Sequence, residues 1–476
     1  MGTDVTATPL AAESAGAALP VDTPGGSREL LKLALPLILA NSFTTIQFTV
    51  DRVFLSWYHP DAMGASMPAA MVFWFVFAFV QGTAGYVSTF VAQYTGANRP
   101  HRVGPAVWHG IHLALAAGIL FWLLWPLAPA VFELAGHEPH MQALESTYFR
   151  TLCAAAMPMG IVAAVTGFFS GRGDSWTVLL VNAVGTIFHI GLDYLVIFGR
   201  GGFPEMGIAG AGWAATVGAW ASALLAVALF ARKRYCAEFD SLNWRPEREL
   251  SGRLLKFGGP AGLQWALDAI SFTLFTLFVG RLGPAEQTAT SLTFTLNLFG
   301  FLPMMGMGQA IAILVGQRLG ENRPDLAERS TILGMRWAAA YAAIVGACYV
   351  VFPHALMTPF EPDPGTEQAV GWPAVAAIVP TLLLCVATYS LADTFNVTYS
   401  FALRGAGDTR FVSLLTFALA WPCMVIPTFL VVYFGGSVYL AWGFATFYIA
   451  VMAGCFWWRF NTGKWKAMRV IEPEVV

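Results

Sequence analysis

The sequence predicts an all-α integral membrane protein with twelve transmembrane helices in two six-helix lobes, related by a pseudo-twofold axis along the membrane normal. The prediction rests on composition, on the count of apolar segments and on an internal repeat. Of the 476 residues, 57% are hydrophobic and only 11% are charged, whereas a soluble protein carries roughly 25% charged residues. The net charge of -2 provides no basic surface for nucleic acid, so we expect the lipid bilayer, and no nucleic acid, as a partner.

Twelve apolar segments are each long enough to cross a bilayer, which takes about 20 residues of α-helix. Some are longer than this minimum, so we expect these helices to tilt or to extend beyond the lipid. The segments cover approximately residues 30–57, 65–94, 104–134, 142–171, 175–198, 208–231, 254–281, 287–317, 326–358, 370–403, 410–434 and 438–459.

The basic residues orient these segments, because Lys and Arg concentrate in the cytoplasmic loops of membrane proteins. With the N-terminus in the cytoplasm, only Arg52, Arg150, Arg200 and Arg281 of the 26 Lys and Arg residues fall toward the outer side. We therefore expect a multi-pass protein of the cell (inner) membrane with both termini cytoplasmic.

Short motifs of the first half return in the second half. "LLKLALP" (30–36) matches "LLKFGGP" (254–260), "GANRP" (96–100) matches "GENRP" (320–324), and "GRGDS" (171–175) matches "GAGDT" (405–409). Six spans return the chain to its starting side, so the copies run in parallel, and transporters built from such repeats place their sites between them. The expected parts are a disordered cytoplasmic tail (1–27), an N-lobe (28–231), a cytoplasmic linker (232–253), a C-lobe (254–460) and a second cytoplasmic tail (461–476).

Away from the ends of the apolar segments, four acidic residues remain: Asp51, Asp193, Asp268 and Asp393. A charge in the bilayer costs at least about 2.5–3.5 kcal/mol, so such residues are candidates for function. His189 precedes Asp193 by one helical turn, which puts both on one helix face. This pair suits a proton or a hard cation, although polar packing would explain it too.

Polar, aromatic and methionine side chains in the second and eighth segments are candidates for the lining of a cargo cavity, because such linings adapt to varied cations. Ordinary helix packing is the alternative for each of them. The residues are Trp74, Gln81, Tyr86, Phe294, Asn297, Met305 and Gln309.

Motifs of the common enzyme classes are missing from the sequence. It contains no HExxH, no GxSxG and no phosphate-binding loop, so we expect a protein that is not an enzyme. The six cysteines form no CxxC pair, and small buried hydrophobic residues are the interpretation that fits them best. We expect no cofactor and no structural metal.

Four motifs carry a resemblance to a known family. "VDRVFLSW" (50–57), "FVAQYTGANRP" (90–100), "LDYLVIFG" (192–199) and "ALRGAGDTR" (402–410), in this order and over roughly residues 28–460, resemble the multidrug and toxic compound extrusion (MATE) family. The resemblance implies a V-shaped pair of lobes that exports organic cations and other drugs by antiport with H⁺ or Na⁺. We expect a monomer that handles small-molecule, mainly cationic drugs.

The resemblance also implies roles for single residues. The family's first-span acid matches Asp51, and its fifth-span pair, usually Asn and Asp, matches His189 and Asp193. These three would form the ion-coupling site, with transient Na⁺ at Asp51 and Asp193 if sodium is the ion. The acids of the NorM-like branch match Asp268 and Asp393, which would handle cargo or cations in the C-lobe.

Two positions depart from the family pattern and leave the coupling ion open. Arg52 follows the first-span acid where the family usually has a small or polar residue, and it could act as a charge partner of Asp51 that displaces a metal ion, or only extend to the outer surface. His189 replaces the usual Asn and favours protons.

Two alternatives remain. One is a flippase of the same superfamily for lipid-linked oligosaccharides or lipids, which the excess of buried acids over buried bases disfavours because such cargo is anionic. The other is a polytopic membrane enzyme, for which the sequence shows no reactive cluster. Efflux, lipid flipping and product formation in everted vesicles would separate the three.

Overall fold

The computed structural model describes residues 25–134, 136–362 and 367–473. Within them, twelve helical segments are long and apolar enough to cross a membrane, which confirms the predicted number of spans. Most of the predicted N-terminal tail (1–27) lies outside the described residues, and the first helix begins at Ser27.

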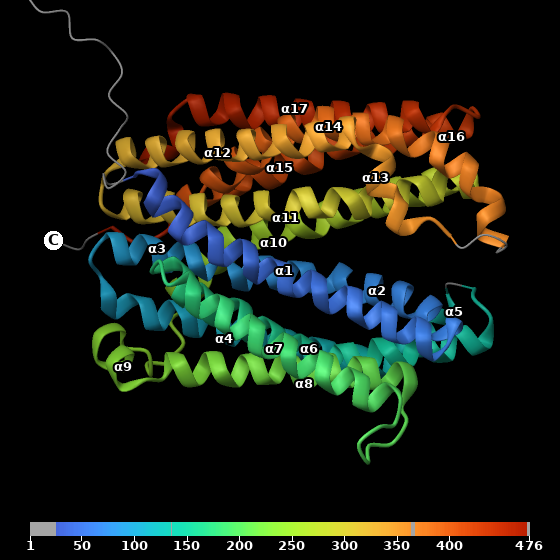
Figure 1. The fold of residues 1–476 in the computed structure, drawn as a ribbon. Helices are drawn as coiled ribbons and strands as arrows, with labels where there is room; N and C mark the ends of the chain where they lie inside the picture. The colour runs from blue at the N-terminus through green and yellow to red at the C-terminus, as the bar shows by residue number, and fades with distance from the viewer. Residues whose placement is uncertain (1–24, 135, 363–366, 474–476) are drawn as a thin grey trace, which may run out of the picture.

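The first six spans form the N-lobe, drawn blue to green in Figure 1. Two of these spans are interrupted, the second at Tyr86 and the third by a turn at Trp125–Leu127. The helices are α1 (Ser27–Tyr58), α2 (Pro60–Gly85), α3 (Val87–Gly96), α4 (Val103–Leu124), α5 (Ala128–Glu133), α6 (Pro139–Gly171), α7 (Ser175–Ile197) and α8 (Gly207–Phe230).

The last six spans form the C-lobe, drawn yellow to red in Figure 1, and the short helix α9 (Lys233–Phe239) lies in the linker between the lobes. The eleventh span contains a π-helical turn at Trp421–Val425. The helices are α10 (Arg248–Gly280), α11 (Pro284–Gly320), α12 (Pro324–Val351), α13 (Pro353–Met357), α14 (Glu367–Ala406), α15 (Thr409–Ala420), α16 (Ile426–Tyr433) and α17 (Val438–Asn461).

Some predicted boundaries are displaced. The ninth span was expected over 326–358, but α12 ends at Val351 and Pro353 starts a separate helix. Proline has no backbone N–H and its ring clashes with the preceding turn, so it kinks or ends a helix. The seventh span was expected from 254, but α10 begins at Arg248, inside the segment 232–253 that was predicted as linker.

The lobes meet through α1, α2 and α3 of the N-lobe, which pack on α10 and α11 of the C-lobe. Figure 1 shows that α1 begins, and the tail after α17 ends, at the same end of the molecule as α9. We call this end the closed end, because the hydrogen bonds that join the lobes gather there.

Two glutamines make reciprocal hydrogen bonds across the closed end. Gln93 of α3 donates through Nε2 to the carbonyl oxygen of Gly405 in the C-lobe, at 3.1 Å. Gln317 of α11 donates through Nε2 to the carbonyl oxygen of Gly171 in the N-lobe, at 2.8 Å. Both glutamines and both glycines occupy matching positions of the internal repeat, so the two bonds are related by the pseudo-twofold axis.

We call the two hydrogen bonds of Gln93 and Gln317 the clasp. Glycines allow the backbones of the two lobes to touch there. A Cβ added at Gly96 would lie 2.0 Å from the carbonyl oxygen of Gln317, and one added at Gly320 would lie 2.3 Å from the carbonyl oxygen of Gln93. Real Cβ atoms do not approach backbone atoms this closely, so any larger residue would push the lobes apart.

The C-terminal segment covers the clasp. The amide of Val470 donates to Gln93 Oε1 at 2.8 Å. The carboxylate of Glu472 accepts from Tyr94 Oη at 2.6 Å and from Arg102 Nε at 3.1 Å. Partial burial raises the pKa of Glu472, but the hydrogen bond from Tyr94 and the charge of Arg102 hold the pKa below its ordinary value overall. This segment therefore joins the end of the C-lobe to the N-lobe.

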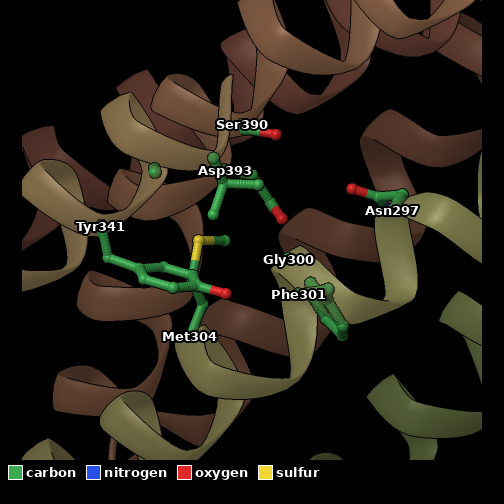
Figure 2. Close-up of a pocket in the computed structure, with 9 residues that line it drawn as sticks. Asn297, Gly300, Phe301, Met304, Tyr341, Ser390 and Asp393 are labelled. Atoms are coloured by element: carbon green, nitrogen blue, oxygen red, sulfur yellow. The ribbon is translucent and has the colours of Figure 1, made fainter. Parts of the chain in front are cut away.

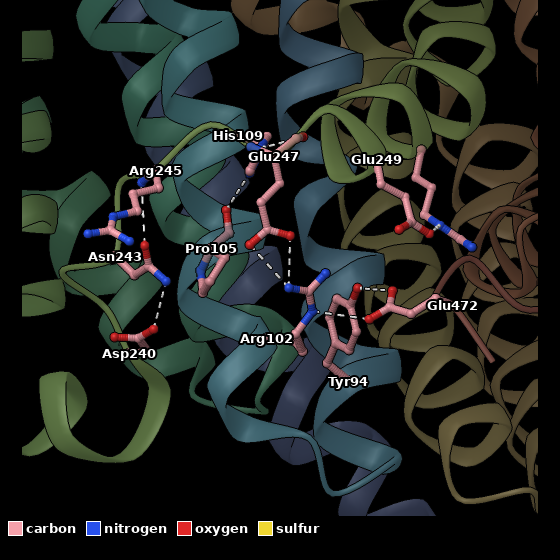
Figure 3. Close-up of polar contacts among 11 residues, drawn as sticks. Tyr94, Arg102, Pro105, His109, Asp240, Asn243, Arg245, Glu247, Glu249 and Glu472 are labelled. Atoms are coloured by element: carbon pink, nitrogen blue, oxygen red, sulfur yellow. Dashed lines mark hydrogen bonds and ion pairs between the residues drawn. The ribbon is translucent and has the colours of Figure 1, made fainter. Parts of the chain in front are cut away.

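The linker reaches the same arginine. Figure 3 shows Arg102 between Glu472 and Glu247, and its Nη1 lies 2.9 Å from Glu247 Oε2. His109 of α4 contacts the backbone of Glu247 through Nε2. The linker and the C-terminal segment thus converge on α3 and α4 at one point of the N-lobe.

Toward the other end of the molecule these bonds stop. Among the described residues, the lobe-joining side-chain hydrogen bond that lies farthest from the closed end runs from Asn41 Nδ2 to Gln309 Oε1, at 3.5 Å. Asn41 lies near the middle of α1. The lobes are therefore tied over one half of their length.

Replacing Gly96 by Ala should loosen the closed end. The added Cβ would collide with backbone, and overpacking of this kind costs about 1–3 kcal/mol, enough to shift the equilibrium between closed and open forms by about tenfold. Thr89 is buried beside Gly316, so a cysteine at this position in a cysteine-free background reports opening of the closed end. Maleimide should label this cysteine about tenfold faster in Gly96→Ala than in the protein with Gly96. Gly85→Ala is the matched control, because a Cβ at Gly85 meets nothing. Equal labelling of the two variants would contradict the prediction.

Candidate functional site

The N-lobe holds a buried cluster of two acids and a histidine. Helix α1 packs along α7, which brings Asp51 to His189 and Asp193. One ligand atom from each of the three lies within 4.8 Å of the others, and their exposed fractions are 6%, 5% and 0%. The structure therefore brings together the three residues that the sequence analysis assigned to the ion-coupling site.

The histidine ring is held from both sides. Its Nε2 lies 2.9 Å from Asp51 Oδ1, and its Nδ1 makes a hydrogen bond of 3.1 Å with Gln47 Nε2. Gln47 was not among the predicted site residues. It precedes Asp51 by four residues, which places it on the same face of α1, and this spacing is the signal that could have found it.

Close packing behind the ring fixes α7. A Cβ added at Gly218 of α8 would lie 2.8 Å from the Cβ of His189, and one added at Gly185 would lie 1.9 Å from Ser222 Oγ. Glycine on both helices therefore lets their backbones approach, and small residues commonly play this role between membrane helices.

Several polar atoms of the cluster have no hydrogen-bond partner. These are Asp51 Oδ1, His189 Nε2 and both carboxylate oxygens of Asp193. Asp51 Oδ1 and His189 Nε2 lie 2.9 Å from each other, so a proton on the ring nitrogen would join them. Buried polar atoms are nearly always paired in folded proteins, so four such atoms in one cluster are a candidate site for a proton or a small cation.

The C-lobe acids lie in a different setting. Asp393 of α14 lines a small pocket with Asn297, Tyr341 and Ser390, shown in Figure 2. Its Oδ1 accepts a hydrogen bond of 2.9 Å from Asn396 Nδ2. Asp268 of α10 is half-buried and lies within electrostatic range of Arg404 and of Asp393, but it does not line this pocket.

The residues predicted to line a cargo cavity are not brought into one cavity. Tyr86 is buried, and its Oη donates to the carbonyl oxygen of Arg404 across the closed end. Gln309 contacts Asn41 of the other lobe, and Met305 belongs to a buried cluster of the C-lobe. The remaining four are dispersed: Trp74 packs edge-on against Phe48, Phe294 packs on Trp442, Asn297 lines the pocket of Asp393, and Gln81 is exposed.

Arg52 is not paired with Asp51. Its side chain is exposed, and its Nη2 lies 3.1 Å from the sulfur of Met67 on α2. Among the described residues, no carboxylate makes an ion pair with it.

Comparison with known proteins decides the family. The MatE family model matches residues 36–195 and 260–430, in both lobes. The chain belongs to the MatE family. Among its curated MatE relatives, the probable multidrug resistance protein NorM of Thermotoga maritima is 24% identical over 460 residues, 96% of each chain. The multidrug resistance protein PmpM of Pseudomonas aeruginosa is 26% identical over 399 residues, 83% of this chain and 81% of PmpM.

Solved structures show the same MatE fold. An outward-facing multidrug resistance MATE family transporter of the MOP superfamily aligns with a TM-score of 0.83 and 20% identity, over 94% of this chain and 97% of that one. A MOP superfamily transporter from Pyrococcus furiosus aligns with a TM-score of 0.82 and 20% identity, over 94% and 98% of the two chains. The two-lobe architecture predicted from the internal repeat is confirmed.

Replacing Asp by Asn should change the unfolding temperature of this MatE chain differently at two buried positions. Asp408 pairs with Arg459, with Oδ2 2.6 Å from Nε, and breaking a buried ion pair costs about 3–5 kcal/mol. Both carboxylate oxygens of Asp193 are buried without a partner, so a neutral amide there removes a cost instead. We expect Asp408→Asn to lower the unfolding temperature in detergent, and Asp193→Asn to leave it unchanged or higher. A lower unfolding temperature for Asp193→Asn would show that this carboxylate is structural.

Proposed function

We propose that this MatE-family chain is a secondary active multidrug exporter of the inner membrane, which moves organic cations and other drugs outward in exchange for protons. The buried cluster of Asp51, His189 and Asp193 carries the proposal, since a membrane protein retains unpaired acids in a span at a cost that function explains. The names of its relatives, multidrug resistance proteins, support the cargo class. One chain contains both lobes, so a monomer is sufficient.

The donor set favours protons over sodium. Hard cations prefer oxygen ligands, whereas the imidazole nitrogen of His189 is a ligand for transition metals and a good proton acceptor. An asparagine at this position would offer an amide oxygen, but His189 offers the ring nitrogen Nε2, which lies 2.9 Å from Asp51 Oδ1. A proton shared between Asp51 Oδ1 and His189 Nε2, which lie 2.9 Å apart, would bridge two of the unpaired atoms.

Helix α1 couples the ion site to the closed end. Its far half carries Asp51, which contacts α7, and its first half packs on α11, where a Cβ at Gly306 would lie 2.8 Å from the backbone nitrogen of Ile38. Proton binding changes the charge on one end of this helix. A shift of α1 that follows would disturb its packing on α11 and let the closed end separate.

The direction of transport follows from the topology. With both termini in the cytoplasm, the closed end is the cytoplasmic end, so the structure faces outward. In this form cargo leaves to the outside and protons enter the cluster from the outside. The reverse state requires the clasp of Gln93 and Gln317 to open.

Asp268 and Asp393 are proposed to bind the cationic group of the cargo. They are acids in the C-lobe, apart from the proton site of the N-lobe. Ion and cargo can therefore occupy different lobes and compete through the conformation of the whole molecule, as alternating access requires.

Asp51→Asn should abolish proton-driven efflux, because an amide cannot take up and release the coupling proton. Dye binding should stay within a few-fold, since Asp51 does not contact the C-lobe acids. The measurement is ethidium efflux from proteoliposomes under an imposed pH gradient and, separately, under a sodium gradient. Asp61→Asn is the matched control and should transport normally, because Asp61 has a half-exposed side chain near the start of α2. Normal pumping by Asp51→Asn under both gradients would refute the mechanism, and wild-type drive by sodium alone would refute the choice of ion.

Asp268→Asn should weaken the binding of a cationic dye more than that of a neutral dye of similar size. Removing the charge that pairs with a desolvated cation costs about 2–5 kcal/mol, which is at least about thirtyfold in dissociation constant. Fluorescence anisotropy on the purified protein measures both dyes. Equal losses for the two dyes would mean that Asp268 is structural.

A further inference from the structure

The C-terminal segment is buried although it forms no helix or strand. It covers residues 468–473, after the short turn Lys464–Ala467 that follows α17, and we call it the strap. Val470 is completely buried, and Ile471 is 7% exposed. The last residues of a domain are usually poorly ordered unless contacts hold them down. The burial of the strap therefore indicates a specific seat on the rest of the molecule.

The strap belongs to the C-lobe by its attachment and by some of its contacts. Trp465, which lies between the strap and α17, is buried and stacks on Phe460 of that helix with ring centroids 4.7 Å apart. The carbonyl oxygen of Val470 accepts a hydrogen bond of 3.1 Å from Arg253 Nη1 of α10. The side chain of Val470 packs so closely on Gly407 that a Cβ there would lie 2.9 Å from its Cγ1. We therefore expect the strap to move with the C-lobe.

The other contacts of the strap reach the N-lobe, at the end of α3 and in the turn that follows it. The carboxylate of Glu472 accepts from Tyr94 Oη at 2.6 Å and from Arg102 Nε at 3.1 Å, as Figure 3 shows. The carbonyl oxygen of Glu472 accepts from Arg99 Nη1 at 2.9 Å. Three donors of the N-lobe thus hold one residue of the strap.

The internal repeat shows that the strap is an addition to the clasp. Gln93 is fully buried, with its Nε2 on Gly405 and its Oε1 accepting from the amide of Val470. The matching Gln317 donates to Gly171 in the same way and is only partly buried. Among the described residues, its Oε1 accepts no hydrogen bond from the chain. One half of the clasp therefore forms without a strap, and the strap adds contacts to the other half alone.

The chain is too short for the strap to stay on both lobes when they separate. Val470 is held on the C-lobe and Glu472 on the N-lobe, and two residues of extended chain span at most about 7 Å. An opening wider than this slack has to break one set of contacts. Because the strap is attached to the C-lobe through α17, the contacts that break are those of Glu472 with Tyr94, Arg99 and Arg102.

We propose that the strap is an intramolecular lock of the closed end, which binds the N-lobe in the closed form and has to release it before the lobes separate. A ligand that binds one of two forms better shifts the equilibrium toward that form, and the strap acts as such a ligand attached to the C-lobe. The proposal rests on the proposed export function for the opening step. It assigns Glu472 to the population of the open form rather than to cargo or to the coupling ion.

Labelling of a buried cysteine measures the lock directly. A cysteine in place of Thr89, in a cysteine-free background, reports opening of the closed end, because Thr89 is buried beside Gly316 of the other lobe. The full chain is labelled with maleimide in dodecyl maltoside, without a gradient and without cargo. The variants compared in this background are Glu472→Ala, Tyr94→Phe and the two combined.

We expect Glu472→Ala to speed labelling by about fivefold or more, the usual effect of losing one net hydrogen bond or more. Tyr94→Phe removes the donor on the other side and should act in the same direction. The combined variant should be little faster than the faster single variant, because both substitutions remove the same contact. Glu238→Gln is the matched control and should change nothing, since Glu238 pairs with Arg234 inside α9.

A second reporter separates release of the lock from general loosening of the protein. The native Cys153 is buried within the N-lobe, and in a variant that keeps this cysteine alone, Glu472→Ala should leave its labelling rate unchanged. Equal acceleration at both positions, or no acceleration at position 89, would overturn the proposal. The labelling requires neither an ion gradient nor cargo, so a failure of the proposed export function appears in the efflux assay and a failure of the lock appears here.

Discussion

The arrangement of the two lobes depends on one repeated hydrogen bond, from a glutamine amide of each lobe to a glycine carbonyl of the other. A buried amide and carbonyl that lose each other leave unsatisfied groups that cost about 1–3 kcal/mol each. The bonds of Gln93 and Gln317 are therefore made together or lost together, since opening the closed end separates both pairs. Bonds that are made or lost together favour two discrete arrangements of the lobes over a continuous range of lobe angles, and alternating access needs such arrangements.

The other features of the molecule follow from this constraint. The glycines at 96 and 320 are needed because a side chain would hold the glutamines out of reach. Helix α1 contacts the closed end with one half and the buried acid–histidine cluster with the other, so under the proposed mechanism a change of charge at Asp51 would act on the closed end through one helix. The C-terminal segment adds the contacts of Glu472 and Val470 to the closed end. Opening the closed end would therefore also break these contacts of the C-terminal segment.

Most of the fold could be predicted from the sequence, because twelve apolar segments, the bias of basic residues and the repeated motifs each have a direct physical meaning in a membrane. The acids of the site could be found for the same reason, since a carboxylate in an apolar span stands out. Gln47 was missed because a lone polar residue in a span has a weak signal of its own. The positions of Tyr86 and Gln309 at the lobe contacts could not be predicted, since the pattern along one helix does not say which neighbour it meets. The breaks at Tyr86 and Pro353 depend on local backbone geometry, which apolar periodicity does not report.

Because the ribosome makes the chain from its N-terminus, the two partners of each clasp hydrogen bond enter the membrane at different times. The carbonyl of Gly171 reaches the membrane four spans before the amide of Gln317 that donates to it, and Gln93 waits longer still for Gly405. Until the eighth span is inserted, the first lobe has to tolerate an unpaired carbonyl and an uncovered glycine surface, and with the closed end at the cytoplasmic side, as proposed, both lie where water can reach them. The position of the clasp near one end of the helices, rather than at their centre, thus lets the half-made protein remain in the membrane while the ribosome completes its partner.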